Sequence, residues 1–202
     1  MIRIKNIKGK TLFEADINSL KECVELAVKK KINLEDANLE SANLEKANLV
    51  GAELKGAYLY KASLERADLN EANLEGAILE RVILRGATLE YANLIEANLI
   101  DSNFIRADLN EVELVGACLN GSWLCGANLY KANLEGASLI GADLERANLF
   151  GTNFNKTNLY RADFRRTNLR EASLKGACLA RTDFEGAILA RDSNQIEKGI
   201  NQ

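Results

Sequence analysis

A leucine or phenylalanine stands at every fifth residue from Leu34 to Leu189, which gives 32 consecutive apolar positions at one spacing. On an α-helix, five residues advance about 500°, so these side chains would spread around the whole cylinder. In a flat strand, side chains alternate with a period of two, so a step of five moves each one to the opposite face. The spacing therefore excludes both regular elements. It predicts short extended segments separated by corners, with the apolar side chains pointing to one interior.

The other positions of the five-residue unit support this interpretation. We number each unit from its Leu or Phe, which is position i. Position i−2 is Ala in 23 of the 32 units, and 12 of the 14 glycines lie at position i+2. Glycine at a fixed place indicates a corner residue with positive φ. Position i−1 is Asn or Asp in 19 units, and we expect these side chains to point outward and to hydrogen-bond along the stack.

Stretches such as ANLESANLEKANLVGAELKG and GADLERANLFGTNFNKTNLY resemble the pentapeptide-repeat family, whose pattern is written A(D/N)LXX. Residues 32–191 match this pattern without a break. The resemblance implies an all-β solenoid, a right-handed quadrilateral parallel β-helix with four pentapeptides per coil. Four pentapeptides per coil would divide the 32 units into about eight coils. Composition and spacing alone predict only a cornered coil.

The N-terminal residues 1–31 lack the period, and we expect them to form a cap over the first coil. Residues 2–5 and 11–15 alternate as in a β-hairpin. Ser19 begins a capping-box sequence, SLKE, that predicts the start of a short helix. Cys23 lies on the apolar face of that helix, so we expect it to face the core.

The C-terminal end has two possible arrangements. Residues 192–202 could form a tail or a short helical lid over the last coil. Alternatively, the last coil could meet a second copy and form an end-to-end homodimer, as some members of the resembled family do. The apolar residues of that coil are Leu174, Leu179, Phe184 and Leu189.

The composition disfavours an enzyme. The chain has no histidine, so it lacks the commonest general base and metal ligand. Its four cysteines, none in a C-x-x-C pair, indicate neither zinc nor a redox couple. We therefore predict no catalytic residue, no cofactor and no metal site. With a net charge of −3 and no apolar run of membrane length, we expect a cytoplasmic protein that contacts neither nucleic acid nor membrane directly.

Four pentapeptides per coil would stack residues 20 apart on the same face, and we number the faces from Leu34. Faces 1 and 4 adjoin, and up to residue 151 twelve acidic side chains oppose two lysines there. Ten net charges over about 29 Å give roughly one per 2.9 Å, against about one per 1.7 Å in duplex DNA. The core of this acidic stripe is formed by Glu53, Asp68, Glu71, Glu75, Glu90, Glu96, Asp108, Glu111 and Glu113.

Two interpretations of the acidic stripe remain open. It could be a solvated surface that keeps a repetitive rod soluble. It could also mimic DNA and bind a type II topoisomerase such as gyrase, because the resemblance includes quinolone-resistance proteins that do so.

Face 2 and the corner beyond it contain aromatic and aliphatic side chains at outward positions, with few charges. They could follow from ordinary β-propensity, or they could form a patch that docks a protein partner. We predict a non-enzymatic interaction scaffold with an unidentified protein partner and with Trp123 as the anchor. The candidate patch consists of Tyr58, Tyr60, Ile78, Ile100, Ile105, Trp123, Ile140 and Tyr160.

Overall fold

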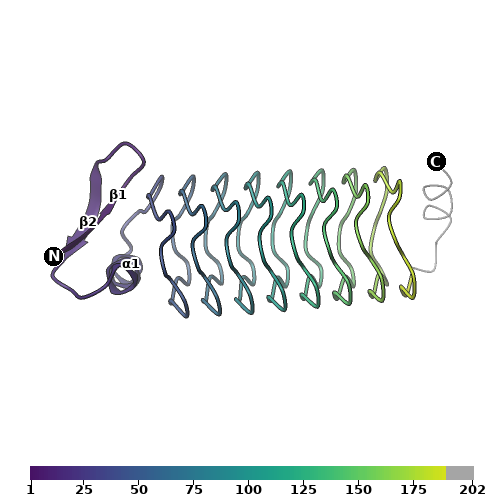
Figure 1. Cartoon of the computed structure of the whole chain (residues 1–202), viewed down its shortest axis with the longest axis horizontal. Coiled ribbons are helices and arrows are strands. Elements are labelled where there is room, and N and C mark those ends of the chain that lie inside the picture. Colours follow the sequence, from purple (N-terminus) through teal and green to yellow (C-terminus); the bar gives the residue numbers. More distant parts are fainter. Residues whose placement is uncertain (190–202) are drawn as a thin grey trace.

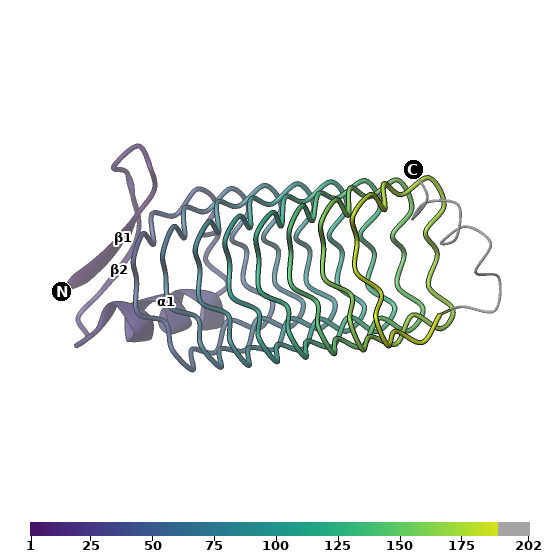
Figure 2. The ribbon, with the colours of Figure 1, turned by 45° about the vertical axis from the view of Figure 1, so that its right-hand side comes forward.

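The computed structural model describes residues 1–189, and it shows a rod of stacked coils with a hairpin and a helix at one end (Figure 1). The tail or lid predicted for residues 192–202 lies outside the described residues. Parallel bridges join residues 20 apart, from Asn38 with Tyr58 to Asn168 with Ile188. One coil therefore contains four pentapeptides, and successive coils lie in register along the rod (Figure 2).

Each corner is a turn of one type. From Asp36 to Gly186, every residue at position i+2 has a φ between +52° and +72°. The N–H of the next residue donates to the carbonyl of residue i, as from Ala37 to Leu34 at 3.0 Å. Positive φ at the third residue alone is the signature of a type II turn. The predicted positive-φ corner is confirmed, and 19 of these 31 corners are formed by residues other than glycine.

All five backbone N–H groups of a typical pentapeptide are hydrogen-bonded, as residues 97–101 show. One N–H closes the turn at 3.1 Å, one donates to the preceding coil at 2.9 Å, and two donate to the following coil at 2.7 and 3.0 Å. The fifth, on Ile100 at position i+1, donates to the side-chain oxygen of Asn98 at 3.2 Å. The ladder between coils thus uses three N–H groups of each pentapeptide, and the turn and the side chain use the other two.

The bond to position i+1 is the main role of the outward Asn and Asp side chains. All 19 of them accept the N–H two residues further along the chain, which is the geometry of an Asx turn. The bonds predicted along the stack also occur, as between Asn93 and Asn73, but in fewer coils. The main reason for Asn and Asp at position i−1 is therefore that their side-chain oxygens accept the backbone N–H at position i+1.

The interior is a continuous apolar column. All 30 Leu and Phe side chains at position i from Leu34 to Leu179 are buried, as the spacing predicts. Near the C-terminal end, three phenylalanines fill the column: the ring centroids of Phe154 and Phe164 lie 5.5 Å apart, and those of Phe164 and Phe184 lie 5.4 Å apart.

The N-terminal part comprises strand β1 (Ile2–Lys5), the antiparallel strand β2 (Thr11–Ala15) and helix α1 (Leu20–Lys29). The N-cap of α1 is Ser19, whose Oγ accepts the Glu22 N–H at 3.1 Å. The predicted burial of Cys23 is confirmed, since its side chain is inaccessible to solvent.

This N-terminal part also bonds to the first coil, which has no preceding coil to accept its outward N–H groups. The Asn38 N–H donates to the Lys5 carbonyl at 2.8 Å, and the Asn48 N–H donates to the Glu25 carboxylate at 3.0 Å. A strand edge left without such partners is open to pairing with another chain. The hairpin and α1 thus replace two of the bonds that a preceding coil would make.

One buried hydroxyl gives a prediction for stability. Ser122 Oγ is buried and has no hydrogen-bond partner among the described residues, whereas Ser102 Oγ, one coil earlier, donates to the Leu99 carbonyl at 2.6 Å. We expect Ser122→Ala to stabilise the rod by about 1 kcal/mol, because an unpaired buried hydroxyl is costly. Ser102→Ala, the matched control, should not stabilise it. Chemical unfolding of both variants measures the difference, and equal losses of stability would contradict the assignment.

The Asx bond gives a second prediction. Asn98→Ala removes the acceptor of the Ile100 N–H and is expected to destabilise the rod by about 1 kcal/mol. Asn98→Asp keeps an oxygen at the same place and should retain most of the wild-type stability. Thermal unfolding of the two variants tests this, and a loss of the same size in both would show that the oxygen is not responsible.

Candidate protein-docking interface

The predicted docking residues lie on two faces. Six of them lie on face 2 or at its corner, and the other two, Ile105 and Trp123, lie on face 3. On face 2, Tyr58 and Ile78 are bridged neighbours, and Tyr58 stacks on Tyr60 with ring centroids 6.1 Å apart. Of these six, only Ile140 is exposed by more than a third, and the others are half-buried.

The polar and aromatic groups of face 2 are largely occupied within the rod. The Tyr60 hydroxyl accepts a hydrogen bond from Arg81 at 3.5 Å, and the Lys61 ammonium lies 4.9 Å from the Tyr60 ring centroid. Arg161 and Arg181 both lie over the Tyr160 ring, at 5.2 and 5.8 Å. The side chains of face 2 are therefore largely engaged within the rod.

Face 3 is different, because its exposed apolar side chains stand beside cations. Trp123 is 52% exposed and Ile83 is 40% exposed, and both are bridged to Asn103 in the coil between them. Trp123 and Cys125 are two residues apart in one extended segment, so both point outward. We call Ile83, Ile105, Trp123, Cys125, Arg66, Arg85 and Arg106 the face-3 patch.

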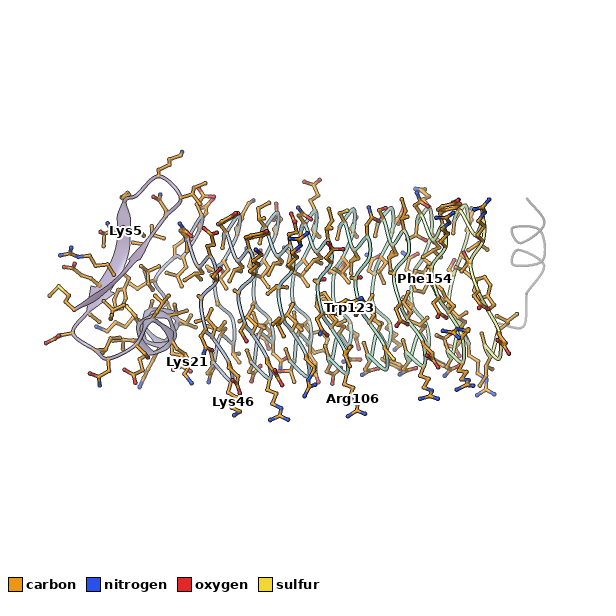
Figure 3. The ribbon with its side chains drawn as sticks, viewed as in Figure 1. Lys5, Lys21, Lys46, Arg106, Trp123 and Phe154 are labelled. Carbon is orange, nitrogen blue, oxygen red and sulfur yellow. The ribbon has the colours of Figure 1, made fainter. Side chains whose placement is uncertain are left out.

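A hollow of about 390 Å³ lies within this patch at the edge between faces 3 and 4. Glycine at the corner makes room there: a Cβ on Gly86 would lie 3.6 Å from Arg66 Cγ, in ordinary van der Waals contact. Arg106 extends beyond the edge of the rod, as Lys46 does on the same edge (Figure 3). The hollow is lined by Arg66, Arg85, Gly86, Ile105, Arg106 and Cys125.

The cations of the hollow are mostly unpaired. Arg85 lies 3.3 Å from the Glu65 carboxylate, and both side chains are partly exposed, so this pair is weak. Within residues 1–189, Arg66 and Arg106 have no carboxylate at salt-bridge distance. Two guanidinium groups thus face solvent beside an apolar surface.

The Cys125 thiol is not suited to nucleophilic chemistry. Burial raises its pKa, and the carboxylates of Asp143 and Glu145 raise it further. A raised pKa keeps the thiol protonated near neutral pH, and the protonated form is a poor nucleophile. Cys125 therefore contributes an apolar wall to the hollow. No group of His, Cys, Asp or Glu in the described part of the chain could hold a metal ion.

Comparison with known proteins identifies the repeat. A model of pentapeptide repeats matches eight copies, over residues 32–70, 47–86, 62–99, 87–124, 127–166 and 157–191. The chain belongs to the pentapeptide repeat family. The comparison with curated proteins gives no significant match.

Several solved pentapeptide-repeat structures are similar. HetL, involved in heterocyst differentiation regulation in Nostoc sp. strain PCC 7120, is 30% identical over 78% of this chain and 89% of its own, with a TM-score of 0.31. A protein from the Arabidopsis thaliana thylakoid lumen is 31% identical over 50% of this chain and 69% of its own, with a TM-score of 0.47. QnrB1, a plasmid-mediated fluoroquinolone resistance protein, is 17% identical over 79% and 91%, with a TM-score of 0.45.

In this pentapeptide-repeat protein, several carboxylates of the acidic stripe of faces 1 and 4 are hydrogen-bonded to their own neighbours. Lys55 Nζ donates to Glu75 at 2.9 Å, and Thr88 donates to Asp68 at 3.0 Å. Side-chain amides of the following coil bond three more carboxylates, those of Glu53, Asp108 and Glu113. Five of the nine predicted stripe residues thus accept side-chain hydrogen bonds within the rod, which is typical of a structural role.

The three arginines of the hollow were not among the predicted docking residues. They lie in three successive coils, and consecutive ones are 19 and 21 residues apart in the sequence. Only the 20-residue coil therefore brings them together. The signal that could have found them is the edge column of Arg66, Gly86, Arg106 and Gly126, in which cations alternate with glycines. No helix of the described residues is long and apolar enough to cross a membrane.

Proposed function

We propose that this protein is a non-enzymatic interaction scaffold that docks a protein partner on face 3, with Trp123 as the anchor. The observation that carries the proposal is the exposure of Trp123, 52%, on a rigid sheet beside Ile83 and the hollow. Exposed tryptophan and arginine are the side chains most enriched at binding hot spots. Face 2 is a secondary contact region in this proposal, since its side chains are less exposed and more often paired than those of face 3.

The same proposal includes the finer features of the rod. The 32 pentapeptides make about eight coils, and the hairpin with α1 acts as the N-terminal cap, since it bonds the first coil. An end-to-end homodimer through the last coil stays a prediction. Such a rod would hold its docking surface in a fixed geometry at low entropic cost on binding.

DNA mimicry is less well supported by the geometry. The stripe has a lower charge density than duplex DNA, and five of its nine carboxylates are bonded within the rod. We therefore place the partner at face 3. Gyrase supercoiling assayed with added protein separates the two functions, and inhibition that needs Glu71, Glu90 and Glu111 would favour the acidic stripe.

The docking function predicts the effect of Trp123→Asn. Asn is the commonest residue at position i−1, and here it would accept the Cys125 N–H, so the rod should be at least as stable as the wild type. Partner binding should fall at least about 30-fold, because a tryptophan hot spot contributes about 2 kcal/mol or more. The control is Tyr91→Asn, which removes an equally exposed aromatic side chain (54%) from another edge.

A quantitative pull-down from the source cell, with the three immobilised forms in parallel, measures this effect. The partner should be retained by the wild type and by Tyr91→Asn and lost by Trp123→Asn. Recovery of the same proteins in the same amounts by all three forms, gyrase included, would mean that face 3 is not the docking surface.

A further inference from the structure

In nine units of the described rod the N–H at position i+1 lacks the acceptor that the repeat normally provides, and two of these donors, Arg85 and Cys125, belong to the face-3 patch. Position i−1 is Ile83 in one unit and Trp123 in another, so no side-chain oxygen meets the N–H of Arg85 or of Cys125. Neither N–H has an acceptor among residues 1–189, whereas the N–H of Ile105 between them donates to Asn103 at 3.0 Å. The two donors lie at the hollow, in the coils on either side of Ile105.

Elsewhere the chain compensates for a missing Asn or Asp in three units. Where position i−1 is Thr88, Ser138 or Ser173, an asparagine of the preceding coil accepts the N–H instead, at 2.8 to 2.9 Å. The asparagines that do so are Asn70, Asn120 and Asn155. No such residue serves Arg85 or Cys125. Because the N–H at position i+1 meets an outward side chain in 19 units, it points outward in these two units as well.

We infer that the face-3 patch binds an extended acidic segment of a partner protein, with an Asp or Glu carboxylate in the hollow and an apolar side chain against Trp123 and Ile83. The inference rests on the docking function proposed above and names the chemistry of the partner. A carboxylate oxygen there would replace the missing Asx acceptor of one of these two N–H groups. It would also pair with Arg66 and Arg106, whose guanidinium groups bind carboxylates in bidentate geometry.

The surrounding charges favour a short acidic segment over a polyanion. Glu45 lies in the coil before the hollow, and Asp143 and Glu145 lie in the coil after it. Glu65 adjoins Arg66 in the first coil of the hollow and is paired with Arg85. The next arginine along this edge, Arg146, lies 3.5 Å from Glu145 and is already paired. A nucleic acid that followed the edge would meet these carboxylates, whereas a single acidic side chain could contact the unpaired guanidinium groups of Arg66 and Arg106.

The test begins with a displayed library of random linear peptides, selected on the whole protein. Enriched peptides are synthesised with a fluorescent label, each also with its acidic residue replaced by the amide, and their affinities are measured by fluorescence polarisation. Trp123 is the chain's single tryptophan, so its emission reports whether a peptide binds beside it. A labelled single-stranded RNA 20-mer serves as the polyanion probe.

The variants are the double substitution Arg66→Gln with Arg106→Gln, and the control Arg146→Gln, which removes a paired arginine two coils along the same edge. We expect enriched peptides to carry Asp or Glu next to a bulky apolar residue and to change the Trp123 emission. Their affinity should fall at least 10-fold in the double variant and in the amide peptides. It should be unchanged in Arg146→Gln.

The other outcomes separate the two proposals. Peptides that need Trp123 but bind equally well as amides would overturn the acidic segment and leave the docking function standing. Peptides that bind Trp123→Asn as tightly as the wild type would instead overturn the docking function. RNA that binds more tightly than the peptides and loses affinity in the double variant would show that the hollow serves a nucleic acid, and would also overturn the inference.

Discussion

Each typical coil depends on an outward Asn or Asp oxygen that accepts the N–H two residues further along the chain. The turn and the ladder between coils satisfy four of the five N–H groups in a pentapeptide, and this oxygen satisfies the fifth. Because the donors of a typical unit are occupied, lysine, arginine or glutamate can form the type II corner as well as glycine. A non-glycine residue there adopts a left-handed conformation, which costs about 1–2 kcal/mol. The buried Leu and Ala column and the bonds between coils hold the corners in place.

This constraint also explains where the rod is variable. Positions i and i−2 face the interior, so they accept only apolar or small side chains. Position i−1 is fixed by the backbone wherever it carries Asn or Asp. A large apolar residue at position i−1 has no oxygen to accept the N–H at position i+1. Ile83 and Trp123 are such residues, and they lie next to unpaired arginines. A loss of internal bonding beside exposed apolar and cationic groups is typical of a surface that is completed by a partner.

The sequence predicted the features that recur in every unit. The leucine spacing indicated the interior, glycine at position i+2 indicated the positive-φ corner, and the apolar face of the N-terminal segment placed Cys23 in the core. The 20-residue coil came only from the family resemblance, because a period of five fixes a corner and leaves the number of corners per coil open. The Asx bond was missed because the preference for asparagine fits bonding along the stack equally well. The hollow could not be predicted from neighbouring residues, since Arg66, Arg85 and Arg106 meet only when coils are stacked.

We infer that the Asx oxygen protects the amide at position i+1, and that its absence at Arg85 and Cys125 leaves two donors free beside the unpaired arginines of the docking surface. Hydrogen exchange of individual amides, followed by NMR in the native rod, tests it most directly. We expect the Arg85 and Cys125 amides to exchange at least about 100-fold faster than the Ile105 amide between them, which donates to Asn103. A bound partner segment should slow the exchange at this surface. Equal protection of the three amides in the free protein would contradict the account.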